Sequence, residues 1–464
     1  MGARFPSWIS AEGGEVVKVF PCLEELSIDN CHSLESIRIT QGIASLLELK
    51  ICDCWRLSSL EVGLHNCTSL QELEIRVCPV LVSIPIPQGM PSLQKLNLFK
   101  CNGLSSLGSG LSYCTSLQEL EIKNCDNLTS IPITQGMPSL RKLNLFKCNG
   151  LSSLGSGLNY CTSLQELEIK DCYKLRSIPI TQGIASLRQL NIWACRGLSS
   201  LGGGLNYCTS LQELEIRDCD ELTSIPITQG ITSLRELKID SCWSLLSLSS
   251  GLQFCTSLED LVITDCSHLV SLSVSYVKCD HPEEISQGVD AYLSVPEEDC
   301  RSVESILARL LELNYVPTVE FHHLTRLKTL RIGAFWEELD AFPHFHLPPN
   351  SQLVELWLFG WPTLESLPQQ IQHLTCLKQL WICDFKGLEA LPEWLGNLTS
   401  LESLSICFCE NLKYLPTQNA MKSLTKLNKL RSDGCPLLKE RCTKETGPDW
   451  PKISHIPDLQ FGYW

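Results

Sequence analysis

The feature that most constrains this chain is a short motif, L-x-x-L-x-[I/L]-x-x-C-x-x-L, which recurs eleven times between Leu23 and Leu272. The first leucines of successive copies are separated alternately by 23 and 24 residues. A copy this short cannot bury its own apolar side chains, because it has no second layer to pack against. If the copies stack, these side chains become buried and each L-x-L segment can pair as a parallel strand with its neighbour. The sequence therefore predicts a solenoid.

Leucines at these offsets are typical of leucine-rich repeats. We expect an α/β, strand-rich leucine-rich-repeat solenoid, with a curved parallel β-sheet on the concave face and irregular or short helical segments on the convex side. The leucine register predicts a degenerate or truncated first repeat (1–22), a regular array (23–272), an irregular insertion or degenerate repeats (273–326), a second array (327–438) and a C-terminal cap or tail (439–464).

Two of these segments leave alternatives open. In the insertion, Ser302 to Asn314 carries apolar residues at helical spacing, which predicts a short helix. Leu258 and Leu327 are 69 residues apart, or three steps of 23, so two degenerate coils could fill the same gap. Because residues 1–22 are too few for a capping helix pair, we expect an open edge at the first strand and an aggregation-prone chain.

Cysteine is the most regular residue after leucine. Eleven cysteines share one repeat offset: Cys31, Cys54, Cys78, Cys101, Cys125, Cys148, Cys172, Cys195, Cys219, Cys242 and Cys266. A second set recurs every 47 residues: Cys67, Cys114, Cys161, Cys208 and Cys255. Both sets fit reduced thiols that pack as small side chains and donate weak S–H bonds to backbone carbonyls.

The composition excludes several classes of function. A net charge of -15 argues against nucleic acid and anionic membranes as partners. The chain has no apolar run of 18 residues, and its start lacks the basic and apolar regions of a secretory signal, so we expect a cytoplasmic protein. No phosphate-binding G-x-x-x-x-G-K-[S/T] loop and no set of nucleophile, base and orienting residue occurs. We therefore predict no enzyme activity, no cofactor and no metal; His322, His323, His344 and His346 lack matching ligands and are interpreted as loop residues.

The candidate site is the outward face of the predicted strands, because side chains alternate between the two faces of a strand. Charge alternates from strand to strand there, which could reflect only an ion ladder that aids solubility. Aromatic residues within this polar surface are instead typical of protein-binding hot spots. We predict a protein-binding face formed by Lys95, Asn97, Phe99, Lys142, Asn144, Phe146, Gln189, Asn191, Trp193, Trp357, Phe359 and Trp381. Tandem duplication could also explain the repeated aromatics, since residues 90–136 and 137–183 match at 41 of 47 positions.

Three segments add a family resemblance. Leu364 to Ile382, Leu388 to Leu404 and Cys435 to Pro457 resemble the C-terminal repeats of plant nucleotide-binding leucine-rich-repeat immune receptors of the coiled-coil class. In that family the repeats sense pathogen effectors or guarded host proteins and hold an adjoining nucleotide-binding module inactive. The resemblance implies a protein partner of one of these three kinds and a role in defence. ADP/ATP exchange is not implied for this chain, which lacks the nucleotide-binding module.

Two other functions remain as alternatives. A substrate-recruiting adaptor of a ubiquitin ligase also favours cysteine at this offset, but it needs an F-box before the repeats, for which 22 residues leave no room. An extracellular repeat receptor or inhibitor would carry a signal peptide, and asparagine where this chain has cysteine.

Overall fold

The computed structural model describes residues 22–38, 43–61, 64, 67–86, 90–133, 137–180, 184–227, 231–246, 248, 251–269, 318–321, 323–333, 344–348, 351–361 and 363–462. They form a leucine-rich-repeat solenoid of parallel strands, as the motif predicts. The chain divides into an N-terminal unit, Met1–Leu222, and a C-terminal unit, Thr223–Trp464.

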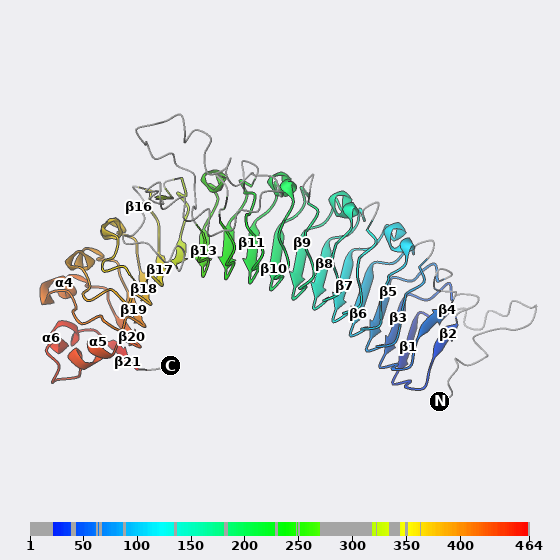
Figure 1. Cartoon of the computed structure of the whole chain (residues 1–464), viewed down its shortest axis with the longest axis horizontal. Helices are drawn as coiled ribbons and strands as arrows, with labels where there is room; N and C mark the ends of the chain where they lie inside the picture. Colours follow the sequence, from blue (N-terminus) through cyan, green and yellow to red (C-terminus); the bar gives the residue numbers. More distant parts are fainter. Residues whose placement is uncertain are drawn as a thin grey trace, which may run out of the picture. The chain divides into compact units, whose positions relative to one another are not determined.

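The N-terminal unit contains a parallel sheet with one strand per coil (Figure 1). Its strands are β1 (Glu25–Asp29), β3 (Glu48–Cys52), β5 (Glu72–Arg76), β6 (Lys95–Phe99), β7 (Glu119–Lys123), β8 (Lys142–Phe146), β9 (Glu166–Lys170), β10 (Gln189–Trp193) and β11 (Glu213–Arg217). Each pairs in register with the next, so leucine lies beside leucine in every coil.

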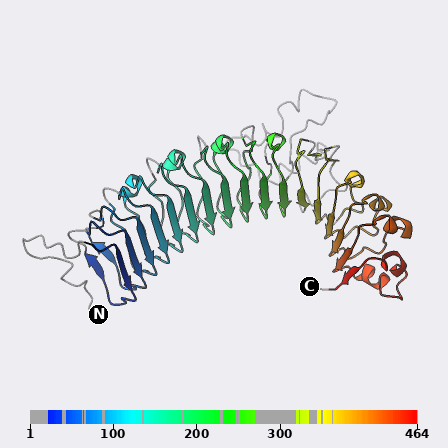
Figure 2. The same ribbon diagram turned by 180° about the vertical axis from the view of Figure 1, so that it is seen from behind.

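The side of the N-terminal unit opposite this sheet carries short elements (Figures 1 and 2). Three 3-10 helices, η2 (Ser109–Tyr113), η3 (Ser156–Tyr160) and η4 (Gly203–Tyr207), occupy alternate coils, which reflects the 47-residue double repeat. Strands β2 (Ser36–Arg38) and β4 (Ser59–Glu61) form a separate parallel pair.

The C-terminal unit repeats this arrangement with more helix. Its sheet contains β12 (Glu236–Asp240), β13 (Asp260–Thr264), β15 (Thr329–Gly333), β17 (Glu355–Phe359), β18 (Gln379–Cys383), β19 (Ser403–Cys407), β20 (Lys429–Asp433) and β21 (Asp458–Phe461). The other elements are η5 (Leu252–Phe254), β14 (Thr318–Glu320), β16 (His344–His346), η6 (Gln369–His373), η7 (Glu393–Asn397), α4 (Gln418–Ser423), α5 (Pro436–Arg441) and α6 (Trp450–Ile453).

In this sheet the strands on either side of the predicted insertion are neighbours. Strand β13 pairs directly with β15, with Asp260 opposite Thr329, so no strand from the intervening segment lies between them. Two degenerate coils, each with its own strand in the sheet, are therefore not the explanation for the 69-residue gap. The helix predicted at 302–314 and the first repeat, apart from Cys22, lie outside the described residues.

A residue in the left-handed backbone conformation follows nearly every strand of the sheets and turns the chain toward the core. Val77 and Asn124 have φ angles of 52° and 54°, and their amides donate to the carbonyls of Phe99 and Phe146, both at 2.8 Å. The residue that follows is the repeated cysteine, which is thereby turned inward. This geometry recurs at Asn30, Asp53, Lys100, Lys147, Asp171, Ala194, Asp218, Ser241, Asp265, Asp384 and Phe408.

The structural role predicted for the cysteines is confirmed. The Cys148 thiol is buried and donates to the carbonyls of Ile122 at 3.5 Å and Phe146 at 3.7 Å. In the second set, the amide of Met90 donates to the Cys114 sulfur at 3.4 Å. Every cysteine that the structure describes is unbridged. These thiols therefore satisfy backbone groups that the turns would otherwise leave unpaired in the core.

Candidate functional site

All twelve predicted site residues occupy outward positions on their strands. We call this surface, made by the first, third and fifth residues of each five-residue strand, the outer strand face. In the N-terminal unit, β6, β8 and β10 each contribute three of the twelve residues, and in the C-terminal unit β17 and β18 contribute the others. The leucines and isoleucines between these positions are buried.

The fifth strand position forms a row in which cations and aromatic rings alternate. The row runs Arg76, Phe99, Lys123, Phe146, Lys170, Trp193, Arg217, with each residue in register with the next. Lys170 Nζ lies 3.5 Å from the Trp193 ring centroid, and Arg217 Cζ lies 5.3 Å from it on the other side. Arg76 Cζ lies 5.3 Å from the Phe99 ring. These are cation–π distances.

The aromatic residues differ from the sequence expectation in their exposure. We expect exposed rings, yet Phe99, Phe146 and Trp193 are half-buried. The reason is the cationic side chains that lie against the rings: Arg76 and Lys100 against Phe99, Lys147 against Phe146, and Lys170 and Arg217 against Trp193. These cations partly shield the three rings from solvent.

The third strand position contributes carboxylates and amides in alternation. Each carboxylate pairs with the cation two residues further along its own strand, as in Lys123–Glu121 at 2.7 Å and Lys170–Glu168 at 2.5 Å. The amides differ: the side-chain oxygens of Asn144 and Asn191 are buried and have no hydrogen-bond partner, and neither has the indole N–H of Trp193. Unpaired acceptors and an unpaired donor are therefore buried beside the aromatic row.

The first strand position carries the ion pairs that the charge alternation predicts. Lys95 pairs with Glu119 at 3.4 Å, and Lys142 with Glu166 at 3.0 Å. The contact with Glu166 raises the pKa of Lys142. Gln189 occupies the same position on β10 and donates to Glu213 at 2.9 Å. Exposed pairs of this kind contribute at most about 1 kcal/mol each to the free energy of unfolding, so they add little to stability.

In the C-terminal unit the aromatic residues contact one another directly. Trp357 and Trp381, opposite each other on β17 and β18, stack with centroids 3.9 Å apart and an interplanar angle of 8°. Arg331 Cζ lies 4.3 Å from the Trp357 ring, and Phe359 lies 5.8 Å from it, centroid to centroid. The indole N–H of Trp357 donates to Glu355, whereas that of Trp381 is buried without a partner.

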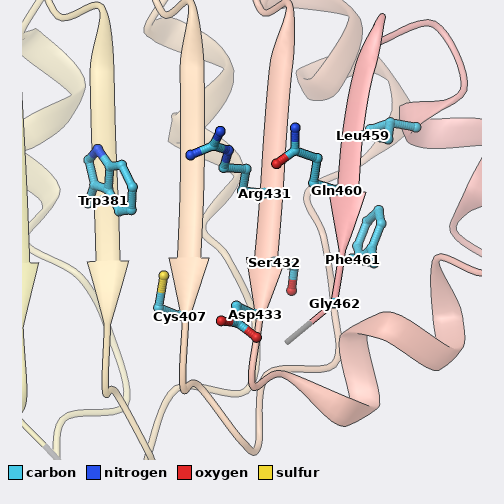
Figure 3. A pocket seen from close by; sticks show the side chains of 9 residues that line it. All are labelled: Trp381, Cys407, Arg431, Ser432, Asp433, Leu459, Gln460, Phe461 and Gly462. Atoms are coloured by element: carbon cyan, nitrogen blue, oxygen red, sulfur yellow. The ribbon is translucent and has the colours of Figure 1, made fainter. Parts of the chain in front are cut away.

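Beside this stack lies a cavity of about 480 Å³ (Figure 3). It is lined by Trp381, Cys407, Arg431, Ser432, Asp433, Leu459, Gln460, Phe461 and Gly462. The cavity exists because β19 has the small outward residues Ser405 and Cys407 between Trp381 of β18 and Arg431 of β20. Figure 3 shows the Arg431 guanidinium reaching over β19 toward Trp381.

Sequence reasoning missed the partners of the aromatic residues. Arg76, Lys170, Arg217 and Arg331 were not among the predicted site residues, although their alternation with the aromatics was readable from the repeat. Arg431 and Cys407 could not be found this way, because the cavity depends on which side chains are small on one strand.

The described residues support neither a metal site nor a membrane span. Within them, no group of three or more His, Cys, Asp or Glu side chains is placed to hold a metal ion. His322 lies outside the described residues, as do the side chains of His344 and His346. None of the helices in the described ranges combines the length and the apolar character needed to span a bilayer.

Two family models match parts of the sequence. The model described as R13L1/DRL21 LRRs matches residues 364–434, which include β18, β19 and β20. The model described as a BspA type leucine-rich repeat region, in six copies, matches residues 22–108 and 76–199. Leucine-rich repeats are therefore present in both units. No curated protein matches the sequence.

A solved structure supports the fold. A leucine-rich-repeat protein of Leptospira interrogans aligns over 95% of this chain and 96% of its own, with 16% identity and a TM-score of 0.50. At this identity the likeness concerns the fold alone. An internalin of Listeria monocytogenes also aligns, over 89% and 88% of the two chains, with 15% identity and a TM-score of 0.37.

Proposed function

We propose that the outer strand face binds proteins, and that the chain acts as the sensor and autoinhibitory repeat region of a plant intracellular immune receptor. The observation that carries the binding proposal is the cation–aromatic row from Arg76 to Arg217. Arginine and large aromatic residues are enriched at the centres of protein interfaces, where they contribute most of the binding free energy. This row holds two arginines and three aromatic rings on adjacent strands, separated by Lys123 and Lys170, and so offers an extended contact surface.

The unpaired polar atoms support the same proposal. A buried acceptor without a partner costs roughly 1 to 3 kcal/mol, so an ion ladder that served only solubility would have no need for the Asn144 and Asn191 oxygens. Neighbouring side chains cover these oxygens and the indole N–H groups of Trp193 and Trp381, so a partner would form hydrogen bonds with them only by moving those side chains aside.

The immune-receptor assignment is supported by the match to the R13L1/DRL21 repeat model. That match covers two of the three segments whose motifs resemble coiled-coil-class immune receptors, Leu364 to Ile382 and Leu388 to Leu404. The partner in this proposal is a pathogen effector, a guarded host protein or a nucleotide-binding module, encountered in the cytoplasm. Nucleotide exchange would belong to that module, because this sequence contains no phosphate-binding loop.

An affinity-capture experiment from plant cell extract tests the proposal with two matched triple variants. The first replaces Phe99, Phe146 and Trp193 on the outer strand face with alanine. The control replaces Tyr113, Tyr160 and Tyr207, which lie on η2, η3 and η4 and are 50%, 54% and 61% exposed. Both remove three aromatic side chains from the same unit.

We expect proteins retained by the wild type and by the tyrosine variant to be lost with the outer-face variant. Unchanged retention by the outer-face variant would remove the binding site from this face. Far-UV circular dichroism confirms that each variant keeps its fold. Identification of the retained proteins as immune-signalling components or effectors tests the finer assignment; retention of ubiquitin-ligase subunits would contradict it.

A further inference from the structure

The outer strand face of the C-terminal unit holds a pair of thiols unlike the buried cysteine rows. Cys383 ends β18 and Cys407 ends β19, and the two are in register on adjacent parallel strands. Both therefore point to the same face. Cys407 is half-buried and lines the cavity beside Trp381, while Cys383 is 7% exposed.

The spacing of adjacent strands is compatible with the Cα separation of a disulfide. Adjacent strands are about 4.8 Å apart, and bridged cysteines have Cα atoms about 4.4 to 6.8 Å apart. The two side chains also lie close enough to change each other's pKa. The same holds for the core pair Cys409 and Cys435, but these thiols are 0% and 4% exposed, so an oxidant in solvent cannot reach them.

The surroundings shift the pKa values of the two thiols in opposite directions. Hydrogen bonding from Cys383 lowers the pKa of Cys407. Burial and the nearby Cys435 and Asp433 oppose this, and Arg431 adds a smaller lowering. The same hydrogen bond, followed by burial, raises the pKa of Cys383. Thiolates are the nucleophiles in oxidation, so Cys407 is the sulfur that reacts first and Cys383 the one that resolves the product.

The geometry points to Cys383 and Cys407 as a reversible oxidation site that forms a cross-strand disulfide with hydrogen peroxide. The Cys407 thiolate attacks one peroxide oxygen, the O–O bond breaks, and a sulfenic acid and hydroxide form. The Cys383 sulfur then attacks the sulfenic sulfur, the S–O bond breaks, and the thiol proton leaves with the hydroxyl group as water. Overall, two thiols lose two electrons and two protons, and peroxide is reduced to two water molecules.

Peptide mapping of the full chain after peroxide treatment and thiol blocking tests this site. Trypsin separates the two cysteines into peptides 379–386 and 387–413, because Lys378, Lys386 and Lys413 follow one another as cleavage sites. We expect these two peptides to be linked, with fragmentation placing the bond at Cys407, and the link to disappear on reduction. The variant Cys407→Ser should lose the link, whereas Cys376→Ser, which removes an exposed cysteine, should retain it.

A second measurement checks the order of the two steps. In Cys383→Ser the sulfenic acid on Cys407 has no resolving thiol, so dimedone should label Cys407, whereas in Cys407→Ser it should not label Cys383. The proposed oxidation site would be refuted if Cys376 were oxidised while peptides 379–386 and 387–413 stayed unlinked. A link formed through Cys409 would refute it too. None of these readouts requires a binding partner, so they are independent of the proposed function.

Discussion

The turn that follows each strand gives a prediction that can be made quantitatively. Val77 and Asn124 occupy the same position two coils apart, with φ angles of 52° and 54° and the same 2.8 Å backbone hydrogen bond. Asparagine tolerates this left-handed conformation, but a β-branched side chain does so only with strain. We therefore predict that Val77→Asn stabilises the N-terminal unit and that Asn124→Val destabilises it.

The magnitude follows from the conformation. A left-handed backbone costs an ordinary L-residue roughly 1 to 2 kcal/mol, and asparagine recovers much of this through local hydrogen bonds. The Val77 side chain is half-buried, so its replacement forfeits little apolar burial. Each single change should alter the free energy of unfolding by about 1 kcal/mol, in opposite directions.

Urea denaturation followed by far-UV circular dichroism measures both changes. The midpoint should rise for Val77→Asn and fall for Asn124→Val, with the slope unchanged. The double variant should return close to the wild-type value, because the sites do not touch and their effects add. A midpoint that falls for Val77→Asn would refute the strain argument and would assign Val77 a packing role instead.

The remaining stability predictions concern the coils and the chain's last helices. Gly155→Ala should lower the free energy of unfolding by at least about 2 kcal/mol, because φ is +66° and a Cβ would lie 2.9 Å from the carbonyl oxygens of Ile131 and Ile133. At Gly203 nothing lies within 4 Å of an added Cβ, so Gly203→Ala should change it by no more than about 0.5 kcal/mol. The same denaturation assay measures both. Burial opposes ionisation of Asp449, but hydrogen bonds from Arg441 and Lys452 outweigh it and lower the pKa of Asp449. Stability from this carboxylate should therefore be complete above its unfolded pKa of about 3.9 and decline as pH falls through the lower folded value. Asp449→Asn should cost about 2 kcal/mol at pH 7 and flatten the acid limb of stability against pH; an unchanged limb would mean that Asp449 is not part of the acid response.

The sequence predicted the elements that depend on strict periodicity. The motif offsets determine which leucines are buried. Because successive side chains of a strand point to opposite faces, the same offsets place Phe99 and Phe146 on the outer strand face. The role of Cys148 followed from its position directly after the strand. These features repeat in every coil, so one correct interpretation extends to all of them.

Other features depend on contacts between neighbouring coils, which a linear motif does not encode. The direct pairing of Asp260 with Thr329 could not be distinguished from two further coils by counting residues. The half-burial of Trp193 arises from Lys170 and Arg217 on the strands beside it. The cavity next to Trp381 arises from the small side chains of the following strand. Each requires knowledge of which residues lie opposite one another.

Site-specific photo-crosslinking tests the central claim, that proteins bind the outer strand face, most directly. A photoreactive phenylalanine analogue at position 146 lies on β8 of that face, and the same analogue at position 160 lies on η3 of the same unit. With partners retained from plant extract, we predict covalent adducts at position 146 and none at position 160. Adducts confined to position 160 would contradict the claim.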